Sequence, residues 1–202
     1  MIENFIFDID GTLVDSKSIY LESLMATLHE HNLQISHPIN VDELFFLPAR
    51  EALESLKIID IDNVLATWGR YYNQLSENAC FYEGVLSAIR LLYDKGKKIL
   101  IVTSRNRNVT VPFCKKSNLE KYISLCVVAE DTKKHKPDPE PLEFAMKKLG
   151  LKEEETVYVG DSYNDYLAAT AAGIKFVVAA WNTEARKLTG LQIDNPISLL
   201  KL

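Results

Sequence analysis

Cysteine is scarce in this chain of 202 residues. Its three cysteines, Cys80, Cys114 and Cys126, are far apart and form no CxxC pair. A disulfide framework or a zinc ribbon needs cysteines in closely spaced pairs. We therefore expect reduced, partly buried thiols and no cysteine-based zinc site.

Long apolar runs and a leader-like start are also missing. The longest apolar runs are a handful of residues, such as 176–181, whereas a membrane-spanning helix needs about 20. Residues 1–10 carry no basic segment, and acidic side chains interrupt their apolar stretch, so we expect no signal peptide. Together these features predict a cytoplasmic protein that makes no membrane contact.

Basic residues are fewer than acidic ones: the chain has 23 Lys and Arg and 28 Asp and Glu, which gives a net charge of −5 at pH 7. An acidic chain without a basic stripe is a poor candidate for binding nucleic acid. The composition, 47% hydrophobic and 25% charged, is that of a folded domain. The length predicts one domain, with room for a small second lobe, as a monomer or a homodimer.

Several short apolar runs alternate with helical patterns, which is typical of an α/β fold. We expect buried parallel strands at 4–9, 98–102, 125–129, 156–159 and 175–179. Helices are expected at 84–95, from Pro139 to Gly150 with Asp138 as N-cap, and from near Ser162 to Gly173. The predicted architecture is a Rossmann-like parallel sheet with right-handed crossovers.

One connection is too long for a simple crossover. Nearly ninety residues separate Asp10 from Lys98, whereas a crossover needs about a dozen plus its helix. The excess carries helical periodicity of its own, so we expect a small helical lobe at 16–80 inserted after the first strand. The core domain would then comprise 1–15 and 81–202.

Polar side chains lie at the carboxyl ends of the predicted strands or in the loops that follow them. Open α/β sheets bind their ligands at this edge. These side chains are Asp8, Asp10, Thr103, Lys136, Asp161 and Asp165. Carboxylates crowded at one edge repel one another unless a cation lies among them. Oxygen ligands with room for a phosphate suit Mg²⁺. The pattern therefore predicts a magnesium and phosphate site.

The same residues carry a family resemblance. DIDGTLVDS at 8–16, Thr103 after ILIV, Lys136 in KPDPEPL and GDSYND at 160–165 resemble, in order, the four motifs of the haloacid dehalogenase-like (HAD) hydrolases. The insertion at 16–80 resembles the helical C1 cap of the phosphoglycolate-phosphatase and β-phosphoglucomutase branch. The resemblance covers essentially the whole chain and implies a HAD-like α/β core.

The resemblance also implies catalytic roles. Asp8 corresponds to a nucleophile that forms an aspartyl-phosphate, and Asp10 to the general acid and base. Thr103 would hydrogen-bond the phosphoryl group, and Lys136 would neutralise its charge.

A Mg²⁺ site is implied as well. Its ligands would be the Asp8 carboxylate, the Asp10 main-chain carbonyl and Asp161. Asp165 would orient Lys136 or a metal-bound water.

The implied function is hydrolysis of a small phosphorylated metabolite, with Ser104, Arg105 and Arg50 as candidate substrate contacts. A phosphomutase of the β-phosphoglucomutase kind and a pyrophosphatase remain alternatives, although TSRN at 103–106 is closer to the phosphatases than to the mutase. A non-catalytic binding domain is a further alternative, against which the intact acidic residues argue. In the cap, Phe46 occupies roughly the place where the family's specificity loop has a glycine, and we expect Trp181 to serve in packing.

Overall fold

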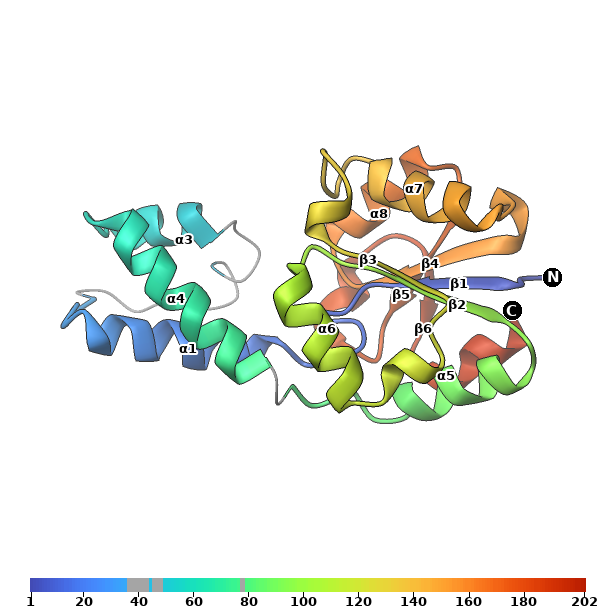
Figure 1. Ribbon diagram of the computed structural model, residues 1–202, viewed down its shortest axis with the longest axis horizontal. Coiled ribbons are helices and arrows are strands. Elements are labelled where there is room, and N and C mark those ends of the chain that lie inside the picture. The colour runs from blue at the N-terminus through green and yellow to red at the C-terminus, as the bar shows by residue number, and fades with distance from the viewer. Residues whose placement is uncertain (36–43, 45–48, 77–78) are drawn as a thin grey trace. The chain divides into compact units, whose positions relative to one another are not determined.

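A six-stranded parallel sheet forms the centre of one of two compact units, which comprises Met1–Asp15 and Cys80–Leu202 (Figure 1). The computed structural model describes residues 1–35, 44, 49–76 and 79–202. The strand order is β3-β2-β1-β4-β5-β6. In chain order, β1 to β6 are Asn4–Phe7, Lys98–Val102, Leu125–Val127, Thr156–Gly160, Lys175–Ala179 and Leu191–Ile193.

The central strands are buried on both faces, which explains why they read as continuous apolar runs. Ile6 of β1 lies in register with Leu100 of β2 and Tyr158 of β4, and all three are fully buried. The chain order reverses where β1 meets β4, because β2 and β3 lie on the other side of β1. The carboxyl ends of strands at such a reversal form a crevice suited to ligands.

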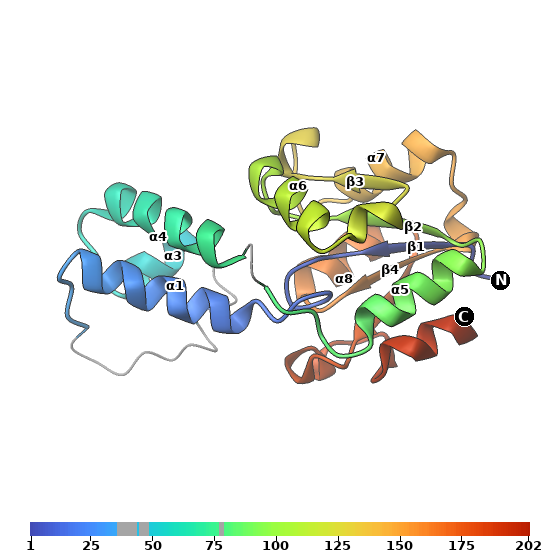
Figure 2. The same ribbon diagram turned by 60° about the horizontal axis from the view of Figure 1, so that its bottom comes forward.

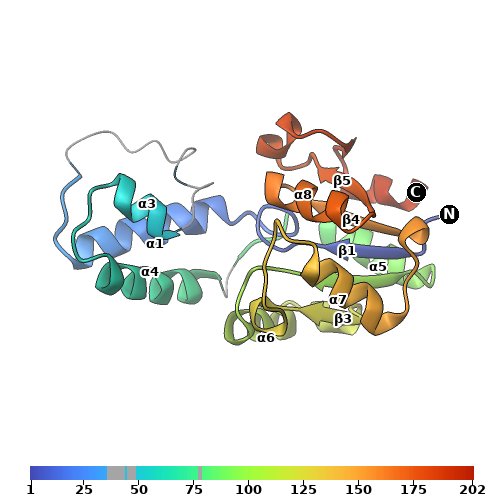
Figure 3. The same ribbon diagram turned by 90° about the horizontal axis from the view of Figure 1, so that it is seen from above.

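Helices cover both faces of the sheet, as Figures 1 and 3 show. Helices α5 (Val85–Asp94) and α6 (Arg107–Lys116) lie on one face, and α7 (Glu140–Leu149) and α8 (Tyr163–Ala171) on the other. Short 3₁₀ helices, η1 to η5, occupy Leu119–Lys121, Ala129–Asp131, Glu153–Glu155, Thr183–Lys187 and Pro196–Lys201. The predicted α/β fold with a parallel sheet is confirmed.

Element ends differ from the predictions in a few places. Strands β1 and β3 end two residues earlier than predicted, which leaves Asp8 in the loop beyond β1 and Ala129 at the start of η2. Helix α7 begins at Glu140 with Pro139 as its N-cap, so the prediction that Asp138 is the N-cap was wrong by one residue. Asp138 still satisfies the helix start, because its Oδ1 accepts the Glu140 N–H at 3.0 Å.

The second compact unit, Ser16–Ala79, is helical (Figure 2). Its helices are α1 (Lys17–Glu30), α3 (Ala49–Ser55) and α4 (Ile61–Ser76), and α1 and α4 lie side by side. Tyr20 of α1 packs edge-on against Trp68 of α4 at 4.9 Å between ring centroids, and the Trp68 indole N–H donates to Ser23 Oγ at 2.9 Å. Among the described residues, no helix has the length and apolar character needed to cross a bilayer.

Candidate active site

The ends of three neighbouring strands bring the motif residues together. Asp8 follows β1, Thr103 follows β2 and Asp161 follows β4, and these strands are adjacent in the order β2-β1-β4. All three side chains are buried, at 6%, 5% and 7% residue exposure. The sheet topology therefore places two carboxylates and a hydroxyl along one short edge, as the sequence predicts.

Lys136 supplies positive charge to this edge from the loop before α7. Its ammonium nitrogen lies 2.8 Å from Asp8 Oδ1 and 2.7 Å from Asp165 Oδ1, and its side chain is only 6% exposed. A third donor bond runs to the hydroxyl of Tyr158 at 2.9 Å. An ammonium group has three hydrogens to donate, so all of them have acceptors within the protein.

Asp165 is fixed by hydrogen bonds at both carboxylate oxygens. Oδ1 accepts from Lys136 at 2.7 Å and from the Tyr158 hydroxyl at 2.8 Å. Oδ2 accepts from the N–H and the hydroxyl of Ser162, at 3.1 and 2.6 Å, in a capping box that begins α8. This carboxylate is a structural anchor for Lys136 and for the helix.

Asp161 lies against the first loop of the chain. Its Oδ1 accepts from the Thr12 hydroxyl at 2.9 Å, and its Oδ2 accepts from the Asn182 amide at 3.2 Å. Gly11, with φ +72°, leaves the necessary space, because a Cβ there would lie 2.0 Å from Asp161 Oδ2. Thr12, in the loop after β1, and Asn182, beyond the end of β5, thus hold Asp161 in place together.

Asp10 does not join this cluster through its side chain. Both of its carboxylate oxygens accept from the Arg105 guanidinium, at 2.7 Å from Nε and 2.6 Å from Nη2. The Arg105 side chain is 4% exposed and its guanidinium lies over the Phe113 ring, 5.1 Å from the centroid. The structure therefore pairs Arg105, predicted to contact substrate, with the half-buried carboxylate of Asp10.

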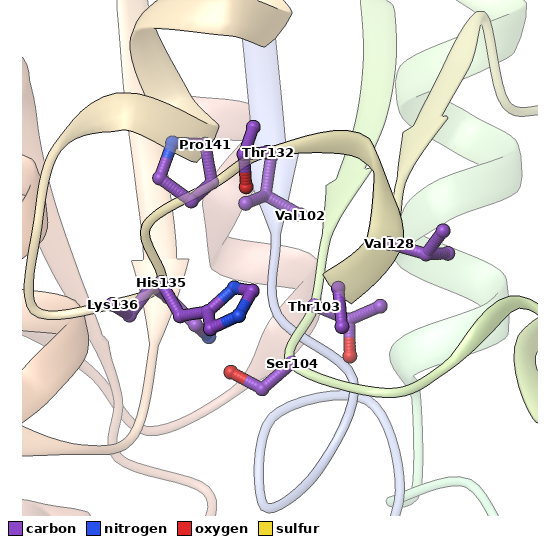
Figure 4. A pocket seen from close by; sticks show the side chains of 9 residues that line it. Val102, Thr103, Ser104, Val128, Thr132, His135, Lys136 and Pro141 are labelled. Atoms are coloured by element: carbon purple, nitrogen blue, oxygen red, sulfur yellow. The ribbon is translucent and has the colours of Figure 1, made fainter.

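Thr103 and Ser104 open onto a small pocket beside Lys136 (Figure 4). The Thr103 hydroxyl accepts the Arg105 N–H at 3.2 Å, which leaves its own hydrogen to donate to a ligand. His135, which is exposed, and Ser104 both line this pocket. Val102, Val128, Ala129, Thr132 and Pro141 complete the lining.

Burial dominates the electrostatics of the cluster. It raises the pKa of Asp8 from its usual 3.8 to about 7, with Lys136 only partly offsetting the effect. Burial also raises the pKa of Asp161 well above its usual value, reinforced by the neighbouring charges of Asp165 and Asp8. Burial opposes the ionisation of Asp165, but the charge of Lys136 and the hydrogen bonds from Lys136, Ser162 and Tyr158 outweigh it and lower the pKa of Asp165. The site thus has an excess of negative charge that one ammonium does not neutralise.

This donor set fits a hard divalent cation. Carboxylate oxygens of Asp8, Asp161 and Asp165 lie within 4.8 Å of one another. Both oxygens of Asp165 already accept two hydrogen bonds each, so Asp8 and Asp161 are the residues of this cluster that could hold such an ion. The raised pKa values of these two groups indicate that they lack a compensating positive charge, which a metal would supply.

Three contributors to the site were not predicted from the sequence. Tyr158 lies in the apolar run of β4, Thr12 in the first motif, and Asn182 follows Trp181 after β5. Trp181 is more than a packing residue, since its indole N–H donates to the Thr12 carbonyl at 2.8 Å. The available signal for Asn182 was its place, an amide side chain shortly after the predicted strand at 175–179, at the edge where such sheets bind ligands.

In the helical unit, Arg50 of α3 makes an exposed ion pair with Asp62 of α4 at 2.5 Å between Nη2 and Oδ1. The hydrogen bond and charge of Asp62, together with the charge of Glu54 on the same helix as Arg50, favour the charged form of Arg50 and raise its pKa. Phe46 lies outside the described residues.

Comparisons with known proteins agree with this geometry. The model of the haloacid dehalogenase-like hydrolase family matches residues 5–179. The chain is 32% identical over 191 residues to a pyrophosphatase, PpaX, of Anoxybacillus flavithermus, covering 92% of this chain and 87% of that protein. A second PpaX, from Halalkalibacterium halodurans, is 30% identical over 89% of this chain and 84% of its own length.

A solved structure gives the same result for the fold. It belongs to a protein assigned as a phosphoglycolate phosphatase from Lactobacillus plantarum, with a TM-score of 0.86 and 26% identity. The alignment covers 100% of this chain and 99% of that one. The motifs, the sheet topology and the family match lead to one conclusion: this chain belongs to the haloacid dehalogenase-like hydrolase family.

Proposed function

We propose that this protein is a Mg²⁺-dependent phosphatase that hydrolyses a small phosphorylated molecule through a phosphoryl group carried on Asp8. The observation that carries the proposal is the position of Asp8. Its carboxylate is buried, hydrogen-bonded at one oxygen to Lys136, and close to Asp161. A carboxylate held in this way is oriented to attack phosphorus and to leave again in a second step.

Lys136 and Thr103 are the groups that bind the phosphoryl oxygens in this proposal. Lys136 already donates to Asp8 Oδ1 at 2.8 Å, so its ammonium lies where nucleophile and phosphate would meet. Thr103 has a hydroxyl hydrogen to donate at the end of the neighbouring strand. Both donors are buried, and buried donors aimed at developing negative charge lower the barrier more than exposed ones do.

Asp10 is the proposed general acid and base. It lies two residues beyond Asp8, and Arg105 holds both of its oxygens. Each oxygen accepts one hydrogen bond from Arg105 and has a second lone pair, through which Asp10 can protonate a leaving oxygen or activate water. Arg105 is therefore proposed to orient Asp10, beside its predicted role as a substrate contact.

The chain's oxygen donors fit Mg²⁺, and Asp8, Asp161 and the Asp10 main-chain carbonyl are its proposed ligands. When bound, the ion supplies positive charge that neutralises the transferring phosphoryl group. Thr12 and Asn182 keep Asp161 directed toward the site through their hydrogen bonds. Asp165 acts through Lys136 instead.

The helical unit, Ser16–Ala79, is the proposed cap that selects the substrate. The phosphoryl site contacts only the PO₃ group and its leaving oxygen, so recognition of the rest of the molecule needs other residues. Arg50 is the proposed contact for a distal anion, which it would bind in exchange for Asp62. Inorganic pyrophosphate is a second candidate substrate, favoured by the named activity of relatives about 30% identical over nine-tenths of the chain.

A direct assay tests the proposal. The protein is incubated with p-nitrophenyl phosphate and with pyrophosphate, each in Mg²⁺ and in EDTA, beside Asp8→Asn and the exposed control Asp94→Asn. We expect Mg²⁺-dependent release of phosphate by the wild type and the control, and background rates for Asp8→Asn. Hydrolysis that persists in EDTA or in Asp8→Asn would contradict the proposal. A panel of phosphorylated metabolites then ranks the substrates.

A further inference from the structure

Tyr158 places a polar hydroxyl in the middle of a buried, apolar strand. It is the third residue of β4, in register with Ile6 and Phe176 on the neighbouring strands, and it is 0% exposed. A buried phenol needs a hydrogen-bond partner. The Tyr158 hydroxyl is hydrogen-bonded to Lys136 and Asp165, which lie 22 and 7 residues away in the sequence.

The hydroxyl bridges these two groups as acceptor and donor. Lys136 Nζ donates to the Tyr158 oxygen at 2.9 Å, and the hydroxyl donates to Asp165 Oδ1 at 2.8 Å, with the Val102 carbonyl more distant at 3.3 Å. Asp165 Oδ1 also accepts directly from Lys136 at 2.7 Å. Ammonium, phenol and carboxylate therefore form a closed triangle of hydrogen bonds in a buried site.

This triangle fixes two of the three hydrogens of the ammonium. The hydrogens of an ammonium are tetrahedrally arranged, so fixing two of them determines the direction of the third. In the structure, the third points to Asp8 Oδ1 at 2.8 Å. A lysine held by Asp165 alone could rotate about that single contact and direct its remaining hydrogens elsewhere.

We propose that Tyr158 is a positioning residue that directs the Lys136 ammonium at the nucleophile and the transferring phosphoryl group. The inference rests on the proposed phosphatase function and deepens it, because it adds a side chain from the middle of β4 to the residues that shape the phosphate site. Tyr158 acts through Lys136 and touches no reacting atom.

Tyr158→Phe removes only the hydroxyl and keeps the ring in the core. It leaves one Lys136 hydrogen without its acceptor and one Asp165 lone pair without its donor, both buried. Loss of a hydrogen bond to a charged group corresponds to roughly 10- to 100-fold in rate or binding. The matched control is Tyr166→Phe, which removes a hydroxyl from a half-buried tyrosine that packs against the same Phe176 ring.

The experiment measures kcat and KM for p-nitrophenyl phosphate, inhibition by inorganic phosphate, and thermal stability. For Tyr158→Phe we expect kcat to fall about 10- to 100-fold and the phosphate inhibition constant to rise, while Tyr166→Phe matches the wild type. Because Tyr158 acts through Lys136, adding Tyr158→Phe to Lys136→Ala should cause no further loss.

Two results would overturn the inference. One is a Tyr158→Phe variant with wild-type kcat and wild-type phosphate inhibition. The other is an equal loss in the wild-type and Lys136→Ala backgrounds, which would make the hydroxyl a general stability contact. A wild type without phosphatase activity would instead overturn the proposed function, and the Tyr158 inference with it.

Discussion

Arg105 and Asp10 form a two-point ion pair in which Nε and Nη2 each donate to a different carboxylate oxygen, at 2.7 and 2.6 Å. The pair joins the loop after β1 to the loop after β2. The planar guanidinium also packs over the Phe113 ring. Its face therefore contacts Phe113, while its edge donates both hydrogen bonds to Asp10. This arrangement fixes the orientation of the proposed general acid and base.

We therefore expect both Arg105→Met and Arg105→Lys to slow turnover. Methionine removes both donors from a half-buried carboxylate, and lysine supplies a point charge without the fork that matches two oxygens. The expected loss in kcat/KM is about 10- to 100-fold for methionine and smaller for lysine. Steady-state kinetics on folded protein measures this, with the exposed Arg90→Met as control. Turnover equal to wild type in Arg105→Met would show that Asp10 needs no such support.

Replacing the two motif I aspartates should have different effects. Asp8→Asn removes the nucleophile and should reduce turnover to background. Asp10→Asn keeps the nucleophile but loses acid and base assistance, which typically costs about 10²- to 10⁴-fold. Turnover of p-nitrophenyl phosphate by both variants gives the comparison. A rate above a few per cent of wild type in Asp8→Asn would exclude attack by Asp8.

Metal binding should strengthen as the pH rises. The pKa of Asp8 is raised to about 7 and that of Asp161 is raised well above its usual value. A carboxyl group whose pKa is higher in the folded than in the unfolded chain favours the folded, metal-free protein at low pH, where the group is protonated. This stabilisation is complete below the pKa of the unfolded chain and is lost as the pH rises through the pKa of the folded protein. Mg²⁺ competes with those protons, so its stabilising effect should grow over the same range.

Thermal unfolding in EDTA and in excess Mg²⁺ measures this dependence. The rise in Tm caused by Mg²⁺ should be larger at about pH 8 than at about pH 5.5. Asp8→Asn, which has no carboxyl to titrate at this position, should show a weaker dependence on pH. If Mg²⁺ raises the Tm by the same amount at both pH values, these carboxylates do not bind the metal.

Asn182 should matter for metal affinity because its amide holds Asp161 at 3.2 Å. We expect Asn182→Ala to weaken Mg²⁺ binding several-fold, roughly the effect of one hydrogen bond to a charged group. Asn195→Ala is a matched control, since Asn195 caps 3₁₀ helix η5 just as Asn182 caps η4. Mg²⁺ titration followed by activity or calorimetry gives the affinities. Equal effects of the two substitutions would assign Asn182 to capping alone.

The space at Gly11 gives a further test of how Asp161 is placed. A Cβ at Gly11 would lie 2.0 Å from Asp161 Oδ2, whereas one at Gly96, also at positive φ, would meet nothing within 4 Å. Both alanine substitutions strain the backbone, but only Gly11→Ala should also abolish Mg²⁺-dependent turnover. Similar activity in the two variants would contradict the placement of Asp161.

The sequence alone predicts much of the site, because its polar residues follow apolar runs and parallel strands align their carboxyl ends. That reasoning found Asp8, Thr103, Lys136 and Asp161, and the family resemblance added their implied catalytic roles. It could not find Tyr158, since a tyrosine in an apolar run is typical of core packing.

Other features were missed for physical reasons. The Arg105 partner lies 95 positions away, and the direction of a guanidinium depends on tertiary packing such as the Phe113 ring. Helix α6 has no counterpart among the predicted elements, because Pro112 in its interior argues against a helix. Strand β6, Leu191–Ile193, is too short and too exposed to show a strand pattern.

The measurement that tests the central claim most directly is detection of the phosphoryl group on Asp8. Asp10→Asn is mixed with p-nitrophenyl phosphate and Mg²⁺, quenched in acid, digested and analysed by mass spectrometry. p-Nitrophenol is a good leaving group, so phosphoryl transfer to Asp8 needs little help from an acid. Hydrolysis of the phosphorylated enzyme lacks its base in this variant, which should therefore accumulate an adduct of about 80 Da on the peptide that contains Asp8. Wild-type protein should show less of the adduct, and the Asp8→Asn/Asp10→Asn double variant none. Rapid p-nitrophenol release by Asp10→Asn without any adduct on Asp8, or with an adduct on another residue, would contradict the account.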